Sequence, residues 1–174
     1  MSKELEAPTM PFGSLPNEMV ELGENVAIEP FTTLGFYGFG FEKKGSKYKY
    51  PLRRKEHGQK LIIGDDVEIG SCTVIHRGSW RPTIIGKGTK IDSHVHIGHN
   101  IQIGEHCLIV TGTTLGGSCT IGKKCFLGMN CTVKEGVKIA DNVTIGMGAV
   151  VTKDITEPNT TWIGVPARKL EKNK

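Results

Sequence analysis

The chain contains 174 residues, of which 37% are hydrophobic and 6% aromatic, and it carries a formal net charge of +4. This length allows one domain with a sizeable core, and no apolar run is long enough to span a bilayer. Its basic residues lack the interleaved aromatics that mark nucleic-acid binders, so nucleic acid is not an expected partner.

Five cysteines without CxxC spacing favour neither a disulfide framework nor a zinc ribbon. The N-terminal residues MSKELEAPTMPF contain no apolar signal segment. We therefore expect a cytoplasmic protein.

A six-residue repeat of aliphatic residues begins weakly near the N-terminus, where Leu22, Ile28 and Leu34 are six apart. Residues 35–62 then interrupt it with an insertion rich in basic and aromatic residues. The repeat resumes at Ile63 with the same spacing. We expect the insertion to be a loop that leaves the repeat and returns to it.

From residue 85 onward the repeat is continuous. Every sixth residue is aliphatic over twelve positions: Ile85, Ile91, Ile97, Ile103, Ile109, Leu115, Ile121, Leu127, Val133, Ile139, Ile145 and Val151. The residue four places after each is small or β-branched, and four of these are cysteines: Cys107, Cys119, Cys125 and Cys131. We expect these cysteines to be structural and to point inward.

A period of six fits neither an α-helix nor a two-faced strand. It is typical of a chain that turns a corner every six residues, so that three hexads close a coil and each strand pairs with the coils beside it. The repeat therefore predicts an all-β solenoid. We expect a single domain over residues 1–174, with a short corner loop at 79–84 and a C-terminal tail at 156–174.

Two stretches resemble known proteins. Residues 38–118, which include GFGF, LIIGDDVEIGSC and IDSHVHIGHNIQIG, resemble the core of UDP-3-O-acylglucosamine N-acyltransferases. Residues 97–170, which include IGHNIQIGEHC and GVPARKL, resemble acetyl-CoA-dependent sugar acetyltransferases of the sialic acid and bacillosamine type. Both groups are hexapeptide-repeat acyltransferases. The resemblance implies a left-handed parallel β-helix that assembles as a homotrimer.

Four of the six histidines lie within DSHVHIGHNIQIGEHC, residues 92–107. His99 occupies the place that the resemblance assigns to the catalytic base, and acyl transfer needs a base of near-neutral pKa. One coil of about eighteen residues further on lies Gly117, roughly 4.8 Å along the axis. Its backbone N–H is the predicted donor to the oxyanion, a role that the resemblance also implies.

Asp92 and Asn100 are the candidates to orient the His99 imidazole, Asp92 because it matches an acid of the lipid A enzymes. For each, a plain turn residue is the alternative. His76 lies one coil earlier and is a predicted substrate contact. We expect the other histidines of the window to be solvated or to lie in an interface.

A γ-class carbonic anhydrase uses the same repeat and binds zinc through histidines. Zinc needs three protein ligands that converge on one point. Gly104 stands where a ligand would be required, and His94 and His99 fall in different phases of the hexad. We therefore expect no metal.

The resemblance at GVPARKL implies that acetyl-CoA is the acyl donor and lies along a groove between subunits. Continuing from His99 by whole coils leads to Lys153, which with Arg168 is the predicted phosphate contact. Phe41 in the insertion is the predicted stacking residue for the acceptor. Solvated surface positions are the alternative for all three.

The sequence thus predicts an acyltransferase that moves acetyl from acetyl-CoA to an amino or hydroxyl group of a nucleotide- or lipid-linked sugar in bacterial surface polysaccharide synthesis. One alternative is longer-chain N-acylation from acyl carrier protein, as in lipid A synthesis. Another is a non-catalytic β-helix that serves as a scaffold or binding module.

Overall fold

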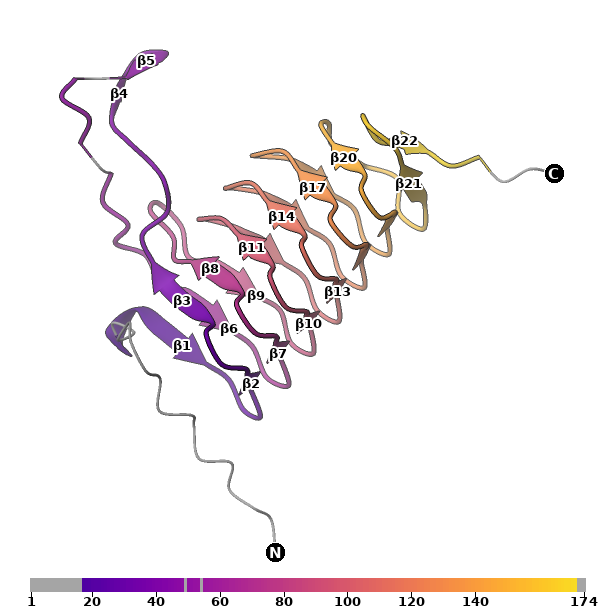
Figure 1. Ribbon diagram of the computed structural model, residues 1–174, viewed down its shortest axis with the longest axis horizontal. Helices are drawn as coiled ribbons and strands as arrows, with labels where there is room; N and C mark the ends of the chain where they lie inside the picture. The colour runs from indigo at the N-terminus through magenta and orange to yellow at the C-terminus, as the bar shows by residue number, and fades with distance from the viewer. Residues whose placement is uncertain (1–16, 49, 54, 172–174) are drawn as a thin grey trace, which may run out of the picture.

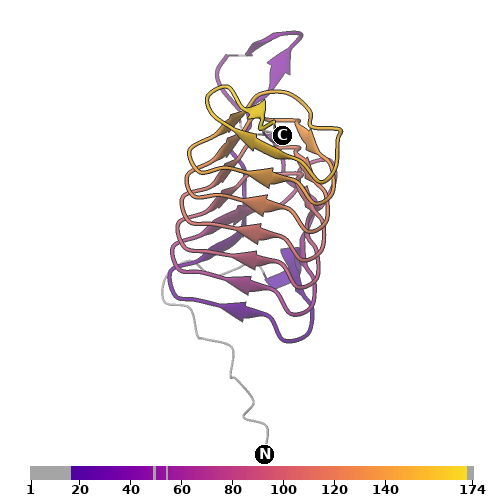
Figure 2. The ribbon, with the colours of Figure 1, turned by 90° about the vertical axis from the view of Figure 1, so that its right-hand side faces the viewer.

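The computed structural model describes residues 17–48, 50–53 and 55–171. After a short 3-10 helix, η1 (Asn17–Met19), the chain winds into a stack of coils with three faces (Figures 1 and 2). Within each face the neighbouring strands of the solenoid are parallel. The architecture is the left-handed parallel β-helix that the repeat and the resemblance predict.

Each face is one sheet whose strands come from successive coils and pair in parallel, except that the terminal β22 of sheet B is antiparallel to β21. Sheet A contains β1 (Val20–Leu22), β6 (Leu61–Ile63), β9 (Thr83–Ile85), β12 (Gln102–Ile103), β15 (Thr120–Ile121) and β18 (Lys138–Ile139). Sheet B contains β2 (Ala27–Ile28), β7 (Glu68–Ile69), β10 (Lys90–Ile91), β13 (Leu108–Ile109), β16 (Phe126–Leu127), β19 (Thr144–Ile145), β21 (Thr161–Ile163) and β22 (Arg168–Lys169). Sheet C contains β3 (Thr33–Phe36), β8 (Val74–His76), β11 (His96–Ile97), β14 (Thr114–Leu115), β17 (Thr132–Val133) and β20 (Val150–Val151).

The register between coils is set by the hexads. Ile97 pairs with Leu115 in sheet C, and Val133 pairs with Val151 one coil later. A shift of one residue would turn every aliphatic side chain outward, so burial of the aliphatic column holds this register. Residues eighteen apart are therefore neighbours along the solenoid from β9 to β20.

The core is the interior of the solenoid. The twelve aliphatic residues from Ile85 to Val151 are buried, with Leu115 and Leu127 at 0% exposure, whereas Leu22 at the weak start of the repeat is 49% exposed because it lies on the first coil. Each fully buried side chain of this size contributes about 1.5–3 kcal/mol relative to an exposed one. The four cysteines predicted to point inward are buried free thiols, whereas Cys72 is exposed.

The insertion leaves the solenoid after β3 and returns to it at β6. Its β4 (Lys43–Lys44) and β5 (Lys47–Tyr48) form an antiparallel hairpin that extends away from the stack of coils (Figure 1). The base of the insertion, unlike the hairpin, packs against the solenoid, and Gly38 and His57 are buried there.

The C-terminal segment covers the last coil. β21 adds to sheet B beside β19, and β22 turns back antiparallel to it. Trp162 takes the register position next to Ile145 and packs on the core, so the tail closes the end of the solenoid. The described residues contain no helix with the length and hydrophobicity needed to cross a bilayer.

Candidate active site around His99

A groove of about 400 Å³ lies where sheet C turns toward sheet A. Its floor comes from three successive corners of the solenoid, at His99, Gly117 and Glu135. The base of the insertion and the corner loop that contains Trp80 form its walls. Polar and ionisable groups from segments far apart in the sequence therefore meet in one concave site, as active sites commonly require.

The imidazole of His99 lies against Gly117, as the coil length predicts. A Cβ atom built on Gly117 would lie 2.9 Å from Cε1 and 3.0 Å from Nε2 of His99. These separations are too short for a real side chain, so the ring occupies the space that any other residue would fill. The structure thus brings the predicted base and the predicted amide donor together.

The backbone of Gly117 lines the groove. At the corresponding corner between sheets B and C, the Thr111 N–H donates to the carboxylate of Asp92 one coil earlier. Gly98 is the equivalent of Asp92 at the His99 corner and has no side chain to accept the Gly117 N–H. Among the described residues, no acceptor takes this N–H. It is therefore free to bind a developing oxyanion.

Asn100 holds the other side of the His99 ring. Its side chain is completely buried, and its Nδ2 lies 2.7 Å from His99 Nδ1. Its Oδ1 accepts hydrogen bonds from the backbone N–H groups of Ser79 at 2.6 Å and Trp80 at 3.3 Å. The corner loop predicted at 79–84 thereby fixes the orientation of the predicted base.

Burial lowers the pKa of the His99 imidazole below its ordinary value. The nearby His57 and Lys55 lower that pKa further, while the negative charge of Glu135 opposes them. The lowered pKa favours the neutral form of the His99 imidazole. A neutral imidazole has one nitrogen that accepts a hydrogen bond and one that donates.

His57 contacts His99 from the insertion. It is 2% exposed, and the two ring centroids lie 5.3 Å apart at 78°. Gly38 fits between the two rings, since a Cβ there would lie 2.5 Å from His99 Cδ2 and 2.9 Å from His57 Nε2. The insertion therefore packs against the predicted base through a glycine that leaves room for both rings.

His76 lies in the same groove, as predicted for a substrate contact. Its ring stacks edge-on against His96, with 5.1 Å between centroids. Burial lowers the pKa of His76, and the neighbouring His96 lowers it further. His96, which the sequence leaves without a role, thus belongs to the groove as well.

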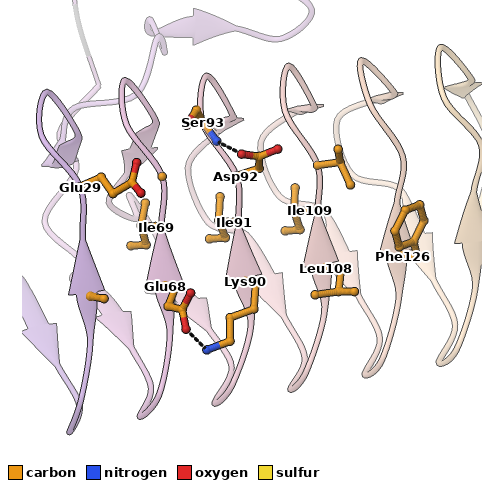
Figure 3. Close-up of a pocket in the computed structure, with 13 residues that line it drawn as sticks. Glu29, Glu68, Ile69, Lys90, Ile91, Asp92, Ser93, Leu108, Ile109 and Phe126 are labelled. Atoms are coloured by element: carbon orange, nitrogen blue, oxygen red, sulfur yellow. Dashed lines mark hydrogen bonds and ion pairs between the residues drawn. The ribbon is translucent and has the colours of Figure 1, made fainter.

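Within one chain, Asp92 does not orient His99, contrary to the sequence-based prediction. Its carboxylate accepts the backbone N–H groups of Ser93 at 2.7 Å and Thr111 at 3.1 Å. It lines a second groove of about 390 Å³ on the face of sheet B, beside Leu108 and Phe126 (Figure 3). Asp92 and His99 occupy different corners of the solenoid, so Asp92 acts as a cap for backbone amides.

Of the three remaining predicted site residues, one lines the His99 groove and two lie outside it. Phe41 lines the His99 groove and stacks edge-on with Phe39, whose ring centroid is 5.1 Å away. Lys153 is exposed and follows β20, one coil beyond Glu135. Arg168 is exposed on β22 at the end of sheet B. Neither of these two cations lines the groove itself.

Two contacts in the site escape prediction from sequence. His57 lies in the insertion, where no repeat assigns a position. The backbone amides of Ser79 and Trp80 have no sequence signature at all, although the extra residues of their loop mark a departure from the hexads. Among the described residues, no group of three or more His, Cys, Asp or Glu side chains is arranged to hold a metal ion.

Comparisons with known proteins agree with this architecture. The family model "Bacterial transferase hexapeptide (six repeats)" matches residues 82–117 and 118–153. The UDP-3-O-acylglucosamine N-acyltransferase of Rhodopseudomonas palustris (strain TIE-1) is 47% identical over 87 residues, which are 50% of this chain and 23% of the relative. The enzyme of the same name from Bradyrhizobium sp. (strain BTAi1) is 47% identical over 89 residues, 50% of this chain and 24% of the relative.

Solved structures show the same fold. A UDP-N-acetylglucosamine acyltransferase superimposes with a TM-score of 0.74 and 29% identity, over 86% of this chain and 54% of that protein. The UDP-N-acetylglucosamine O-acyltransferase of Moraxella catarrhalis gives a TM-score of 0.75 at 22% identity, over 87% of this chain and 55% of that protein, and supports the fold alone.

The match to the curated relatives covers about a quarter of their length. The family model covers residues 82–153, which include His99 and Gly117. What the match establishes is the nature of the repeat. Residues 82–153 match the bacterial transferase hexapeptide model, and half of this chain is similar in sequence to UDP-3-O-acylglucosamine N-acyltransferases.

Proposed function

We propose that the chain is an acyltransferase that transfers an acyl group from a thioester to an amino or hydroxyl group of a sugar. The observation that carries this proposal is the His99 imidazole packed against Gly117, which lines the same groove and whose N–H has no acceptor among the described residues. Acyl transfer needs both a group that handles a proton and a donor for the oxyanion.

The proposed reaction begins when the sugar amine or hydroxyl attacks the thioester carbonyl. The negative charge that develops on the carbonyl oxygen is stabilised by the Gly117 N–H. His99 stands beside the same carbon, where a neutral imidazole either accepts the proton of the attacking group or donates a hydrogen bond to the oxyanion. The first of these roles is the one that the sequence predicts.

Acetyl-CoA is the proposed donor. Lys153 continues the line of corners from His99 through Gly117 and Glu135, so a donor lying along the solenoid with its thioester at His99 would bring its phosphates toward this cation. Arg168 on the tail is the second proposed phosphate contact.

Longer-chain N-acylation from acyl carrier protein is the second candidate. The curated relatives are named N-acyltransferases of an acylglucosamine linked to UDP, and the insertion places exposed basic residues such as Lys43 and Lys55 at the groove. Such residues suit either the phosphates of a nucleotide-linked sugar or an acidic carrier protein. Phe41 is the proposed stacking residue and His76 a proposed polar contact for the sugar.

The setting of the reaction belongs to the same proposal. We place the enzyme in the cytoplasm as a homotrimer that serves bacterial surface polysaccharide synthesis. The trimer is what the resemblance to hexapeptide-repeat acyltransferases implies, and the names of the curated relatives support an amino sugar linked to a nucleotide as acceptor.

The test combines purified protein with acetyl-CoA or acylated carrier protein and a panel of nucleotide-linked amino sugars. Mass spectrometry of the product identifies the acyl chain, and release of free thiol gives the rate. We expect turnover with one donor and its loss in His99→Ala. Absence of CoA binding in calorimetry, together with no thiol release from either donor, would instead identify a non-catalytic β-helix.

A further inference from the structure

The amide of Asn100 has only one orientation that satisfies its neighbours. Its Oδ1 receives two backbone N–H donors, from Ser79 at 2.6 Å and Trp80 at 3.3 Å. A rotated amide would turn its NH₂ group toward these two donors, which have no lone pair to accept it. Because Asn100 is fully buried, water does not relieve such a clash, so Nδ2 must face His99.

This orientation determines which nitrogen of His99 carries the proton. Asn100 Nδ2 lies 2.7 Å from His99 Nδ1 and has only hydrogens to offer. His99 Nδ1 must therefore accept, and the proton of the neutral imidazole lies on Nε2. Protonation of Nδ1 would set two N–H donors against each other, which adds to the burial that already keeps the ring neutral.

From this network we infer that Asn100 is a positioning residue that holds His99 in the Nε2–H tautomer, so that His99 acts in the resting site as a hydrogen-bond donor. The inference rests on the proposed acyl transfer and refines the role of His99 in it. His99 Nε2 lies against the backbone of Gly117, since it is 3.0 Å from a Cβ built there, and both residues line the same groove.

In this arrangement the two N–H groups form a pair of donors for the carbonyl oxygen of the thioester. The bond from the sugar nitrogen or oxygen to the carbonyl carbon forms, the carbon–sulfur bond breaks, and the hydrogen of the attacking group ends on the departing thiolate through solvent. His99 keeps its own proton throughout. Neutral imidazole is a suitable donor here because it can donate a hydrogen bond to the oxyanion without giving up its proton.

The tautomer is measurable without any substrate. In protein labelled with ¹⁵N in the histidine rings, two-bond nitrogen–proton correlations distinguish the Nε2–H form from the Nδ1–H form, and His99→Gln identifies the His99 signals. We expect the Nε2–H pattern in the wild type. The same spectra of Asn100→Asp should show the Nδ1–H pattern, because a carboxylate of the same shape can only accept and still satisfies the Ser79 and Trp80 amides.

Asn130→Asp is the matched control. Asn130 occupies the same turn position in another corner, with φ of 55° against 59° for Asn100, and it lies outside the groove. We expect this variant to leave both the His99 signals and turnover unchanged. It separates the effect of the tautomer from the general effect of a new carboxylate in a turn.

Kinetics then test the donor role. If the Nε2–H binds the oxyanion, Asn100→Asp should lower kcat by about 10²–10³-fold with little change in KM, the usual cost of one oxyanion donor. An Nδ1–H pattern in the wild type, or an Asn100→Asp variant that turns over as fast as the wild type, would overturn the inference. Failure of the proposed function is distinguished because it appears as absence of turnover in the wild type itself.

Discussion

Substitution of Gly117 by alanine tests the contact between His99 and Gly117, because the repeat tolerates a side chain at this backbone position. In all the other hexads from residue 85 to 153, the residue two places after the core aliphatic residue carries a side chain. The backbone at this position of the hexad therefore accepts a side chain. Gly117 does not have a positive φ. The nearest obstacle to the added methyl is the His99 ring, whose Cε1 and Nε2 would lie 2.9 Å and 3.0 Å away.

The ring must move by roughly 0.5–1 Å to restore ordinary contact, while Asn100 on one side and Gly38 on the other hold it in place. A misplacement of about 1 Å costs about 10²-fold in rate, which corresponds to about 2.7 kcal/mol of activation free energy. Folding stability should change little, because the gain of about 0.4–1 kcal/mol that Gly→Ala brings through the unfolded chain is offset by the contact with the displaced ring.

The assay is initial-rate release of free thiol with saturating sugar, together with thermal unfolding of the same samples. Lys123→Ala is the control, since Lys123 occupies the same position of the hexad at another corner and its side chain pairs on the surface with Glu105. We expect a kcat lowered about 100-fold for Gly117→Ala and an unchanged Tm. Wild-type turnover in Gly117→Ala, or a Tm several degrees lower, would refute the proposed contact between His99 and Gly117.

Three further predictions follow from the same structure. Leu127→Ala should lower the free energy of unfolding by about 2–5 kcal/mol in urea titrations, because Leu127 is fully buried in the solenoid. Burial lowers the pKa of His76 and His96 from the ordinary 6.5, so the unfolded chain takes up protons first as the pH falls. Stability should therefore be full above pH 6.5 and decline below it, and His76→Gln should flatten this decline in thermal melts. Lys153→Ala and Arg168→Ala should raise KM for acetyl-CoA while leaving kcat nearly unchanged, and an unchanged KM in both would remove them from the donor site.

The sequence predicts the fold and the meeting of His99 with Gly117 for the same physical reason. A hexad that buries one aliphatic residue per turn permits one register only, and that register makes residues eighteen apart neighbours. The same hexad register predicts that Asp92 lies away from His99. Asp92 directly follows Ile91 in sheet B, whereas His99 follows Ile97 in sheet C, so the two side chains belong to different corners.

The contacts outside the repeat could not be predicted in this way. His57 reaches His99 only because the insertion folds back onto the solenoid, and no period in its sequence sets where it lands. The Ser79 and Trp80 amides that hold Asn100 belong to the backbone, whose direction depends on how the corner loop closes. Local loop geometry, and with it the tautomer of His99, requires the three-dimensional structure.

The coils and the insertion would contribute differently to the choice of substrate. His99 and the Gly117 N–H would act on any thioester, and both are held in place by the regularly spaced coils of the solenoid. The groups that vary around them come from the insertion, where Phe41 and Lys55 line one side of the groove. A change of acceptor therefore needs new residues only in the insertion, since the aliphatic register that aligns the reacting groups would be undisturbed. Exchange of residues 39–56 between relatives of this repeat type should transfer acceptor preference, measured as the ratio of kcat/KM for two sugars, while Gly38 and His57 are kept to hold His99.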